Sequence, residues 1–135
     1  MILIDAGPLV ALVDEDDQHH AKCVATLKQL REPLATVWPP VVEAMYLLSG
    51  LPLAREALWE MLERSAVLLL PLDANDIPRI RELMGKYRNR RMDFADAALL
   101  RVAERENTKK IFTVDRRDFS VYRLHNRMRL TLIPA

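Results

Sequence analysis

The sequence predicts an α/β fold, a three-layer α/β/α sandwich with a mainly parallel sheet of about five strands. Short apolar runs recur along the 135 residues and alternate with segments whose apolar side chains have helical spacing. This alternation is typical of parallel strands joined by helices that cover both faces of a sheet. The run 67–70, Val-Leu-Leu-Leu, is apolar at every position, as expected of a strand buried on both faces.

The first 30 residues are expected to form one strand and two helices. Residues 1–4 are an apolar run, and Pro8 suits the first turn of the short helix that follows. A second helix is predicted over 19–30, where the apolar residues fall on one face. Either Asp16 or Asp17 is placed to cap its N-terminus.

The middle of the chain is expected to supply two more strands, at 34–37 and 67–70, separated by two helices. Two consecutive prolines begin the helix over 39–48, because proline fits the first helical turn, and Gly50 closes it. The next helix, over 53–64, carries apolar residues at core spacing.

The C-terminal part completes the alternation. A helix over 73–87 begins at an Asp-Ala-Asn-Asp cap, and a basic loop at 88–91 leads into a helix over 93–106. Strands are predicted at 110–114 and 130–133. Residues 1–135 are interpreted as a single domain, because no repeat, linker or low-complexity segment divides them and the length is ample for one core.

The composition bounds the setting and the chemistry. Cys23 is the only cysteine, and neither a secretory signal nor an apolar run of membrane-spanning length is present. We therefore expect a soluble, cytoplasmic protein that does not enter a membrane. The absence of a glycine-rich phosphate loop and of CxxC pairs argues against nucleotide-driven chemistry and against zinc.

Charge is distributed unevenly although the net charge is only +1. Residues 1–78 contain 5 basic and 12 acidic side chains, whereas residues 79–135 contain 15 basic and 7 acidic ones. Solvated helix faces explain much of such an asymmetry. The basic part could also lie along a nucleic-acid backbone while the acids gather a metal ion.

Several carboxylates stand directly against apolar residues, where burial is costly unless the group is paired or binds a cation. Asp5 and Asp115 follow predicted strands, and the carboxyl ends of neighbouring parallel strands are where ligands bind. Each of them could also be only a turn residue or a helix cap. Asp73 follows a strand too, but capping explains it fully, so it is excluded from the site.

Three further acids lie on predicted helices. Asp93 and Asp96 are three residues apart and therefore point to one side. Asp93 opens its helix and could be the cap, whereas Asp96 lies one turn inside, where it caps nothing. Glu43 lies among apolar residues and is equally compatible with a surface position. Hard oxygen ligands of this kind suit a divalent cation and phosphodiester chemistry.

In four places the chain resembles a known family. The pieces that carry the resemblance are Leu3-Ile4-Asp5, Glu43 within Val-Val-Glu-Ala, the run from Asp96 to Glu104, and the run from Thr113 to Phe119. In order, spacing and total length they are similar to the PIN-domain ribonucleases, and within these to the VapC-type toxins of bacterial and archaeal toxin–antitoxin modules. The resemblance spans essentially the whole chain, although no single piece is specific.

The resemblance implies a Mg²⁺- or Mn²⁺-dependent endoribonuclease, usually a homodimer, which is silenced by an antitoxin whose tail enters the active-site groove. The residues that match the family's acidic quartet are Asp5, Glu43, Asp96 and Asp115. Asp93 matches an acid frequent in this subgroup. Many members have Ser or Thr directly after the first aspartate, where this chain has Ala6, while Thr113 keeps the family's hydroxyl before the last aspartate.

The expected chemistry is in-line attack of a metal-activated water on phosphorus, with one or two ions. The main ligands are expected to be Asp5, Asp96 and Asp115, with Asp93 as a further candidate. Glu43 would be a ligand or a base that orients the water. Candidates for holding RNA phosphates are Arg88, Arg90, Arg91, Arg116 and Arg117, although each alone is explained more simply as a surface charge. The alternatives are a metal-dependent DNA nuclease or phosphatase and a non-catalytic PIN-like module that binds RNA or a protein.

A homodimer surface is predicted in the middle of the chain. Residues 53–70 hold more large apolar side chains than one buried helix face and one strand require. The candidates are Leu58, Trp59, Met61 and Leu62.

Overall fold

The computed structural model describes residues 1–135 and contains a parallel five-stranded sheet in the order β3-β2-β1-β4-β5. The strands are β1 (Ile2–Ile4), β2 (Leu34–Thr36), β3 (Val67–Leu69), β4 (Lys110–Phe112) and β5 (Thr131–Ile133). The helices are α1 (Ala6–Val13), α2 (His20–Gln29), α3 (Trp38–Leu47), α4 (Pro52–Glu63), α5 (Ile77–Lys86), α6 (Phe94–Arg105) and α7 (Arg116–Phe119), with short 3₁₀ helices η1 (Ala74–Asp76) and η2 (Arg88–Arg90). The predicted fold class is confirmed, and each strand is one or two residues shorter than expected. None of the helices is both long and apolar enough to cross a lipid bilayer.

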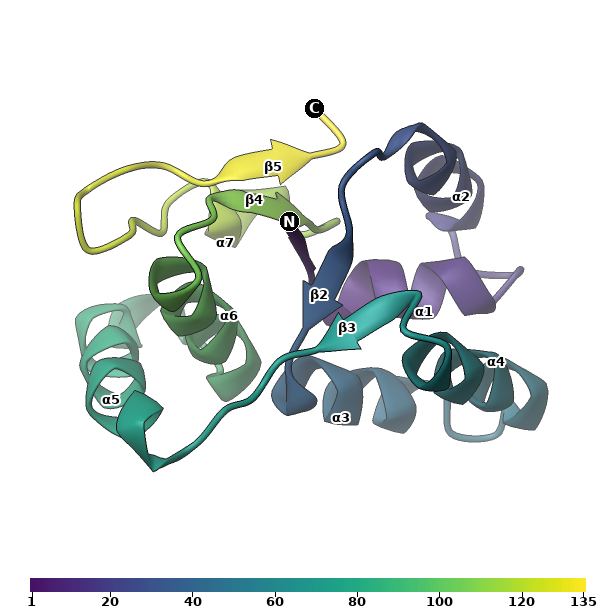
Figure 1. The fold of residues 1–135 in the computed structure, drawn as a ribbon, viewed down its shortest axis with the longest axis horizontal. Helices are drawn as coiled ribbons and strands as arrows, with labels where there is room; N and C mark the ends of the chain where they lie inside the picture. The colour runs from purple at the N-terminus through teal and green to yellow at the C-terminus, as the bar shows by residue number, and fades with distance from the viewer.

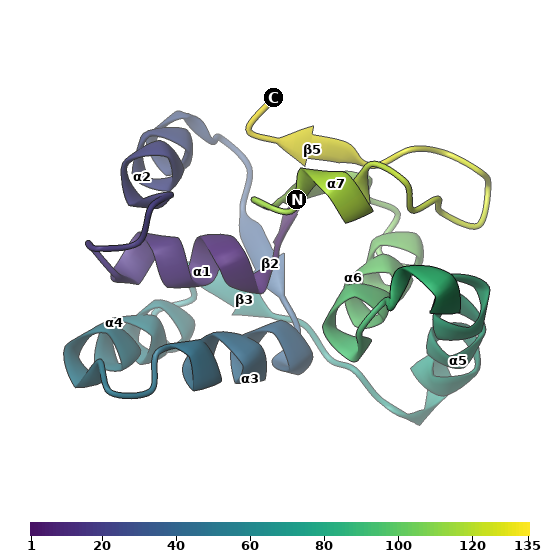
Figure 2. The same ribbon diagram turned by 180° about the vertical axis from the view of Figure 1, so that it is seen from behind.

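Helices cover both faces of the sheet, which gives the three layers (Figure 1). Helices α1 to α4 lie on one side and α5 and α6 on the other, as the reverse view also shows (Figure 2). The side chains of β1 alternate between the two resulting cores. Ile2 and Ile4 pack with residues of α1, α3 and α4, whereas Leu3 packs with residues of α5 and α6.

The central strand β1 is the point from which the chain extends in both directions across the sheet. From β1 the chain moves to β2 and β3 on one side, and it then returns through α5 and α6 to β4 and β5 on the other. Leu3 pairs with Ile111 and Ile4 with Phe112, so β1 and β4 end side by side. Parallel sheets of this topology bind ligands at the carboxyl ends of the strands beside such a switch point.

Two local predictions are wrong in detail. The second helix begins at His20, and its N-cap is His19 rather than Asp16 or Asp17. Asp17 instead stabilises the turn before the helix, because its Oδ1 accepts a hydrogen bond from the backbone N–H of His19 at 2.8 Å. The basic loop at 88–91 contains the one-turn helix η2, which ends at Arg90 and is followed by Arg91 with a φ of 56°.

The predicted dimer surface on α4 is largely wrong. Leu58 is fully buried, and Met61 and Leu62 pack against the core formed with α1 and β3. These side chains form the inward face of the helix, so only Trp59 of the four is exposed. The core of a single chain therefore accounts for Leu58, Met61 and Leu62, whereas other apolar residues of the segment are exposed, namely Leu53, Trp59, Leu68 and Leu69.

Candidate functional site

The carboxyl ends of β1 and β4 place two aspartates at the topological switch point. Asp5 follows β1 directly and is the N-cap of α1, with its Oδ1 accepting from the backbone N–H of Ala6 at 2.8 Å. Asp115 is the N-cap of α7, and its Oδ1 accepts from the N–H of Asp118 at 3.2 Å. Asp115 is the third residue after β4 rather than the first, because the strand ends at Phe112.

Helices α6 and α3 supply the other predicted acids. Asp93 is the N-cap of α6, where its Oδ1 accepts from the N–H of Asp96 at 2.8 Å. Asp96 lies in the first turn of α6 rather than one turn inside it, and its Oδ2 accepts from the hydroxyl of Tyr122 at 2.8 Å. Glu43 is half-buried on α3. Capping therefore accounts for the position of Asp93 but not for that of Asp96 or Glu43.

The charges of these acids act on one another. Burial raises the pKa of Asp5 to about 7. The hydrogen bonds from Ala6 and Thr113 lower this pKa, whereas the negative charges of Glu43 and Asp93 raise it further. Burial raises the pKa of Asp96 to about 8, and the negative charges of Asp5, Asp93 and Asp115 add to the effect. Burial likewise raises the pKa values of Glu43 and Asp115. The five acids therefore form one electrostatic cluster.

None of the five acids forms an ion pair with a basic side chain within 4.0 Å. Asp76 shows how the same protein neutralises a buried acid: it pairs with Arg101 at 2.8 Å and Arg105 at 3.1 Å. Burial alone would raise the pKa of Asp76, but hydrogen bonds from the Asp73 amide and the two arginines hold that pKa below its usual range. The acidic cluster lacks such partners, so its negative charge is available to an external cation.

The donor chemistry of the cluster fits a hard divalent cation, since every group offers carboxylate oxygens. No three His, Cys, Asp or Glu side chains are already grouped so that they could hold one metal ion. A complete coordination shell would therefore require carboxylate side chains to rotate towards one another. Asp93 is the most accessible member of the cluster, Glu43, Asp96 and Asp115 are half-buried, and Asp5 is buried.

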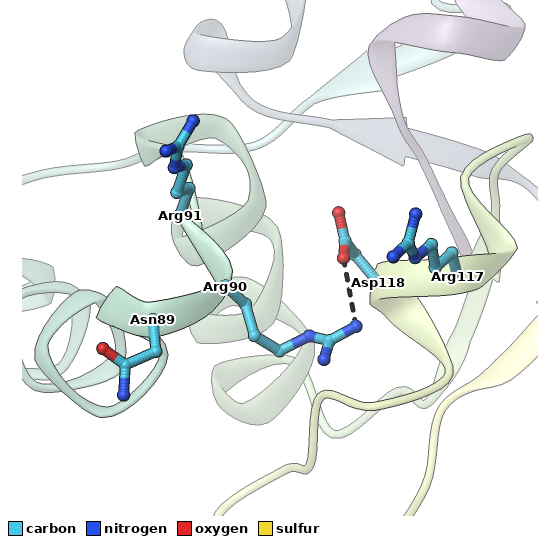
Figure 3. Close-up of a pocket in the computed structure, with 5 residues that line it drawn as sticks. All are labelled: Asn89, Arg90, Arg91, Arg117 and Asp118. Carbon is cyan, nitrogen blue, oxygen red and sulfur yellow. Dashed lines mark hydrogen bonds and ion pairs between the residues drawn. The ribbon is translucent and has the colours of Figure 1, made fainter.

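A basic cavity of about 480 Å³ lies between η2 and α7. Its lining residues are Asn89, Arg90, Arg91, Arg117 and Asp118 (Figure 3). The Arg90 side chain reaches across to Asp118, with 3.4 Å between Nη2 and Oδ1. Three of the five predicted arginines thus meet at one cavity.

The other two predicted arginines do not line this cavity. Arg116 donates a hydrogen bond to the carbonyl oxygen of Pro134, on the side towards the C-terminus. Arg88 is an exposed residue of η2. Asp118 was not predicted to lie beside these arginines, and it does so because α7 places Arg117 and Asp118 on the side that faces η2.

Two of the acids line an apolar cavity of about 500 Å³. Glu43 and Asp93 line it together with Trp38, Pro39, Val42, Phe94 and Ala95. Trp38 is 48% exposed and Phe94 is 50% exposed, which is unusual for large aromatic side chains without a partner. Sequence patterns did not indicate either aromatic residue, since the exposure of one side chain depends on how α3 and α6 pack.

Two hydroxyl groups contact the aspartates of the cluster. Thr113 donates to Asp5 Oδ2 at 3.1 Å, and Tyr122 donates to Asp96 Oδ2 at 2.8 Å. Thr113 was singled out by the family resemblance, as the hydroxyl before the last aspartate. Tyr122 was not, because it lies 26 residues from Asp96 and no local spacing connects them.

Comparisons with known proteins agree on one family. The family model of the PIN domain matches residues 2–124. Ribonuclease VapC26 of Mycobacterium tuberculosis (strain ATCC 25618 / H37Rv) is 31% identical over 136 residues, which cover 98% of this chain and 100% of that protein.

Solved structures share the fold at low sequence identity. The crystal structure of Mycobacterium tuberculosis VapC20, a Sarcin-Ricin loop cleaving toxin, has a TM-score of 0.79 at 17% identity and covers 87% of this chain and 92% of its own. A toxin–antitoxin complex from Klebsiella pneumoniae has a TM-score of 0.68 at 16% identity, covering 90% and 92%. VapBC2 from Rickettsia felis, bound to a DNA fragment from its promoter, has a TM-score of 0.62 at 16% identity, covering 98% and 97%.

Proposed function

Because this chain belongs to the PIN-domain family, we propose that it is a metal-dependent endoribonuclease and the toxin of a toxin–antitoxin pair. One observation supports this proposal above all others. Two carboxylates follow β1 and β4 at the switch point, three more on α3 and α6 act on them electrostatically, and none of the five forms an ion pair with a basic side chain. Such a cluster is costly to the folded protein unless a cation binds it, so a structural role alone does not account for it.

The proposed cation is Mg²⁺ or Mn²⁺, held by Asp5, Asp96 and Asp115, with Asp93 at the edge of the same cluster. The chemistry supplied by such a cation is activation of a water molecule and stabilisation of negative charge on the phosphate. Glu43 orients the attacking water and accepts its proton at a carboxylate oxygen, a role that suits its raised pKa. Because the carboxyl groups must be ionised to bind a cation, metal affinity should increase with pH.

The two cavities beside the acids suit a single-stranded RNA. Arg90, Arg91 and Arg117 offer positive charge to backbone phosphates. Trp38 and Phe94 offer exposed aromatic faces on which unpaired bases can stack. The Arg90–Asp118 pair holds one arginine in place until a phosphate competes for it.

The proposed protein partner is an antitoxin. The similarity to the Klebsiella and Rickettsia complexes supports a toxin–antitoxin setting. An antitoxin should carry a basic or polar segment that enters the acidic cluster and displaces the cation, since the cluster is unpaired in the isolated chain. Co-purification of one small protein with this chain from its native host, with loss of ribonuclease activity in the complex, is the expected result.

Cleavage of end-labelled single-stranded RNA by the purified protein tests the enzymatic proposal. We expect cleavage with Mn²⁺ or Mg²⁺ and none with EDTA. Asp5→Asn and Asp96→Asn should each reduce the rate about 100-fold or more. Asp73→Asn is the matched control, since Asp73 only caps η1 and asparagine caps equally well.

The same assay separates the alternatives. Cleavage of DNA in preference to RNA would indicate a DNA nuclease. RNA binding without cleavage in any divalent cation would indicate a non-catalytic module. Equal losses for Asp73→Asn and Asp96→Asn would show that the site has been misplaced.

A further inference from the structure

We propose that Tyr122 is a positioning residue that fixes the carboxylate of Asp96 for cation binding. This inference rests on the proposed function, because it assigns a role towards the same metal site. It adds a residue that lies outside the acidic cluster and carries no charge of its own.

Backbone hydrogen bonds orient three of the aspartates but not Asp96. Asp5, Asp93 and Asp115 are N-caps, and each carboxylate accepts a backbone N–H from the helix that it begins. Asp96 lies in the first turn of α6, where its own N–H donates to Asp93. No backbone N–H donates to the Asp96 carboxylate, which therefore has no such anchor. The hydroxyl of Tyr122, 2.8 Å from Oδ2, takes that place.

The Tyr122 ring is itself held rigidly. It is fully buried and meets the ring of Tyr87 edge-on at 5.0 Å and that of Phe119 at 5.3 Å. Its backbone N–H donates to the carbonyl of Asp118 at 3.2 Å. Phe119 and Asp118 belong to α7, whose N-cap is Asp115. One short helix therefore fixes Asp115 directly and Asp96 through Tyr122.

A rigid hydroxyl donor of this kind restricts the rotation of a carboxylate that would bind a metal ion. Partners that orient metal ligands typically contribute about 10–100-fold to metal affinity or activity. Tyr122 lines neither the basic cavity nor the apolar one. Its loss should therefore weaken cation binding without weakening RNA binding.

The test is a calorimetric titration of the full chain with Mn²⁺, together with RNA cleavage at increasing Mn²⁺ concentration. Tyr122→Phe keeps the ring and removes only the hydroxyl. We expect its Kd for Mn²⁺ to rise about 10–100-fold, its KM for RNA to stay unchanged, and its cleavage rate to recover as Mn²⁺ increases. Tyr87→Phe is the matched control, because the Tyr87 hydroxyl accepts from the N–H of Arg123 and touches no carboxylate of the cluster. Its Mn²⁺ affinity should equal that of the wild type.

The outcomes separate this inference from the proposed function. If the wild type neither binds Mn²⁺ nor cleaves RNA, the proposed function fails and the role of Tyr122 falls with it. If the wild type does both and Tyr122→Phe binds Mn²⁺ equally well, only the positioning role is overturned. Should Tyr122→Phe fail to fold, Phe119→Leu removes one of the two supports of the ring. Weaker Mn²⁺ binding by that variant would support the role, and unchanged binding would overturn it.

Discussion

Thr113 links Asp5 to the segment that carries Asp115. The hydroxyl of Thr113 donates to Asp5 Oδ2 at 3.1 Å and accepts the backbone N–H of Asp115 at 3.0 Å. A single buried hydroxyl thus joins the ends of β1 and β4 across the switch point of the sheet. Ala6 has no hydroxyl to offer, so Thr113 is the side-chain donor to Asp5.

Thr113→Val should impair both the site and the fold. Valine has nearly the same shape but leaves Asp5 without its hydroxyl donor and the Asp115 N–H without its acceptor. We expect a stability loss of about 1–3 kcal/mol and a fall in RNA cleavage of about 10–100-fold. Chemical denaturation and the cleavage assay measure the two effects.

Thr36→Val is the matched control for Thr113→Val. Thr36 is also buried on the sheet, and its hydroxyl donates to the carbonyl of Ile4 at 3.0 Å. It should lose similar stability but keep its cleavage rate. If both variants lose activity to the same degree, the Thr113 contact has no specific role in the site.

The stability of the cation-free protein should fall as pH rises. The folded-state pKa values of Asp5 and Asp96, about 7 and about 8, lie above the ordinary value of 3.8. Between roughly pH 4 and pH 8 the folded protein therefore binds more protons than the unfolded chain, and the free energy of unfolding decreases with pH over that window. Thermal melts in EDTA at several pH values measure this dependence.

Asp96→Asn should change this pH profile. Without one of the crowded carboxylates, the variant should melt higher than the wild type near pH 8 and at a similar temperature near pH 4. Mg²⁺ should raise the melting temperature of the wild type more than that of the variant, because binding to the folded state stabilises it. Asp73→Asn should behave as the wild type does in both respects. Identical Mg²⁺ responses in the wild type and Asp96→Asn would argue against a cation site.

Arg117→Ala should lower the affinity for RNA and should make that affinity less dependent on salt concentration. Removing one phosphate contact should lower the slope of log K against log salt by about 1. Binding is best measured in the Asp96→Asn background, so that the RNA is not cut. Arg64→Ala is the control, since Arg64 is an exposed residue of α4 that pairs only with Glu60. An unchanged salt slope for Arg117→Ala would exclude the basic cavity as a phosphate site.

Trp38→Ala should reduce the affinity for single-stranded RNA but not for a duplex. Stacking on an aromatic side chain contributes about 1–3 kcal/mol per base, and paired bases are not free to stack in this way. Trp59→Ala, which removes the other exposed tryptophan from α4, should leave RNA affinity unchanged. Fluorescence anisotropy with labelled RNA measures both. Equal effects of the two substitutions would argue against a base-binding role for the apolar cavity.

The homodimer is still expected, but at the start of the predicted segment and the preceding turn rather than at Leu58, Met61 and Leu62. The most exposed large apolar side chains are Leu53 at 86% and Tyr46 at 75%, on either side of the turn from α3 to α4. Tyr46→Glu combined with Leu53→Glu should convert a dimer into a monomer in sedimentation experiments, whereas Trp59→Glu should not. A wild-type protein that is already monomeric at micromolar concentration would contradict the dimer itself.

Much of the fold was predictable because apolar periodicity reports which faces are buried. The five strands and the alternation with helices follow from short apolar runs, and the Asp73 cap follows from its local spacing. The start of α2 was not predictable, because several aspartates precede it and the path of the loop decides that none of them caps the helix. Leu58 was misassigned to a surface because its burial depends on packing between helices that are distant in sequence.

The sequence alone determined which acids stand against apolar residues, since that property is local. Only the tertiary structure decided which of them are neutralised. Asp76 and Asp96 are both acids of the α5–α6 region, yet Asp76 meets two arginines of α6 while Asp96 meets a tyrosine hydroxyl and other carboxylates. Charge compensation depends on distances through space. The side chains that hydrogen-bond to Asp76 and Asp96 lie 25 or more positions away from them in the sequence. No spacing along the chain encodes those distances.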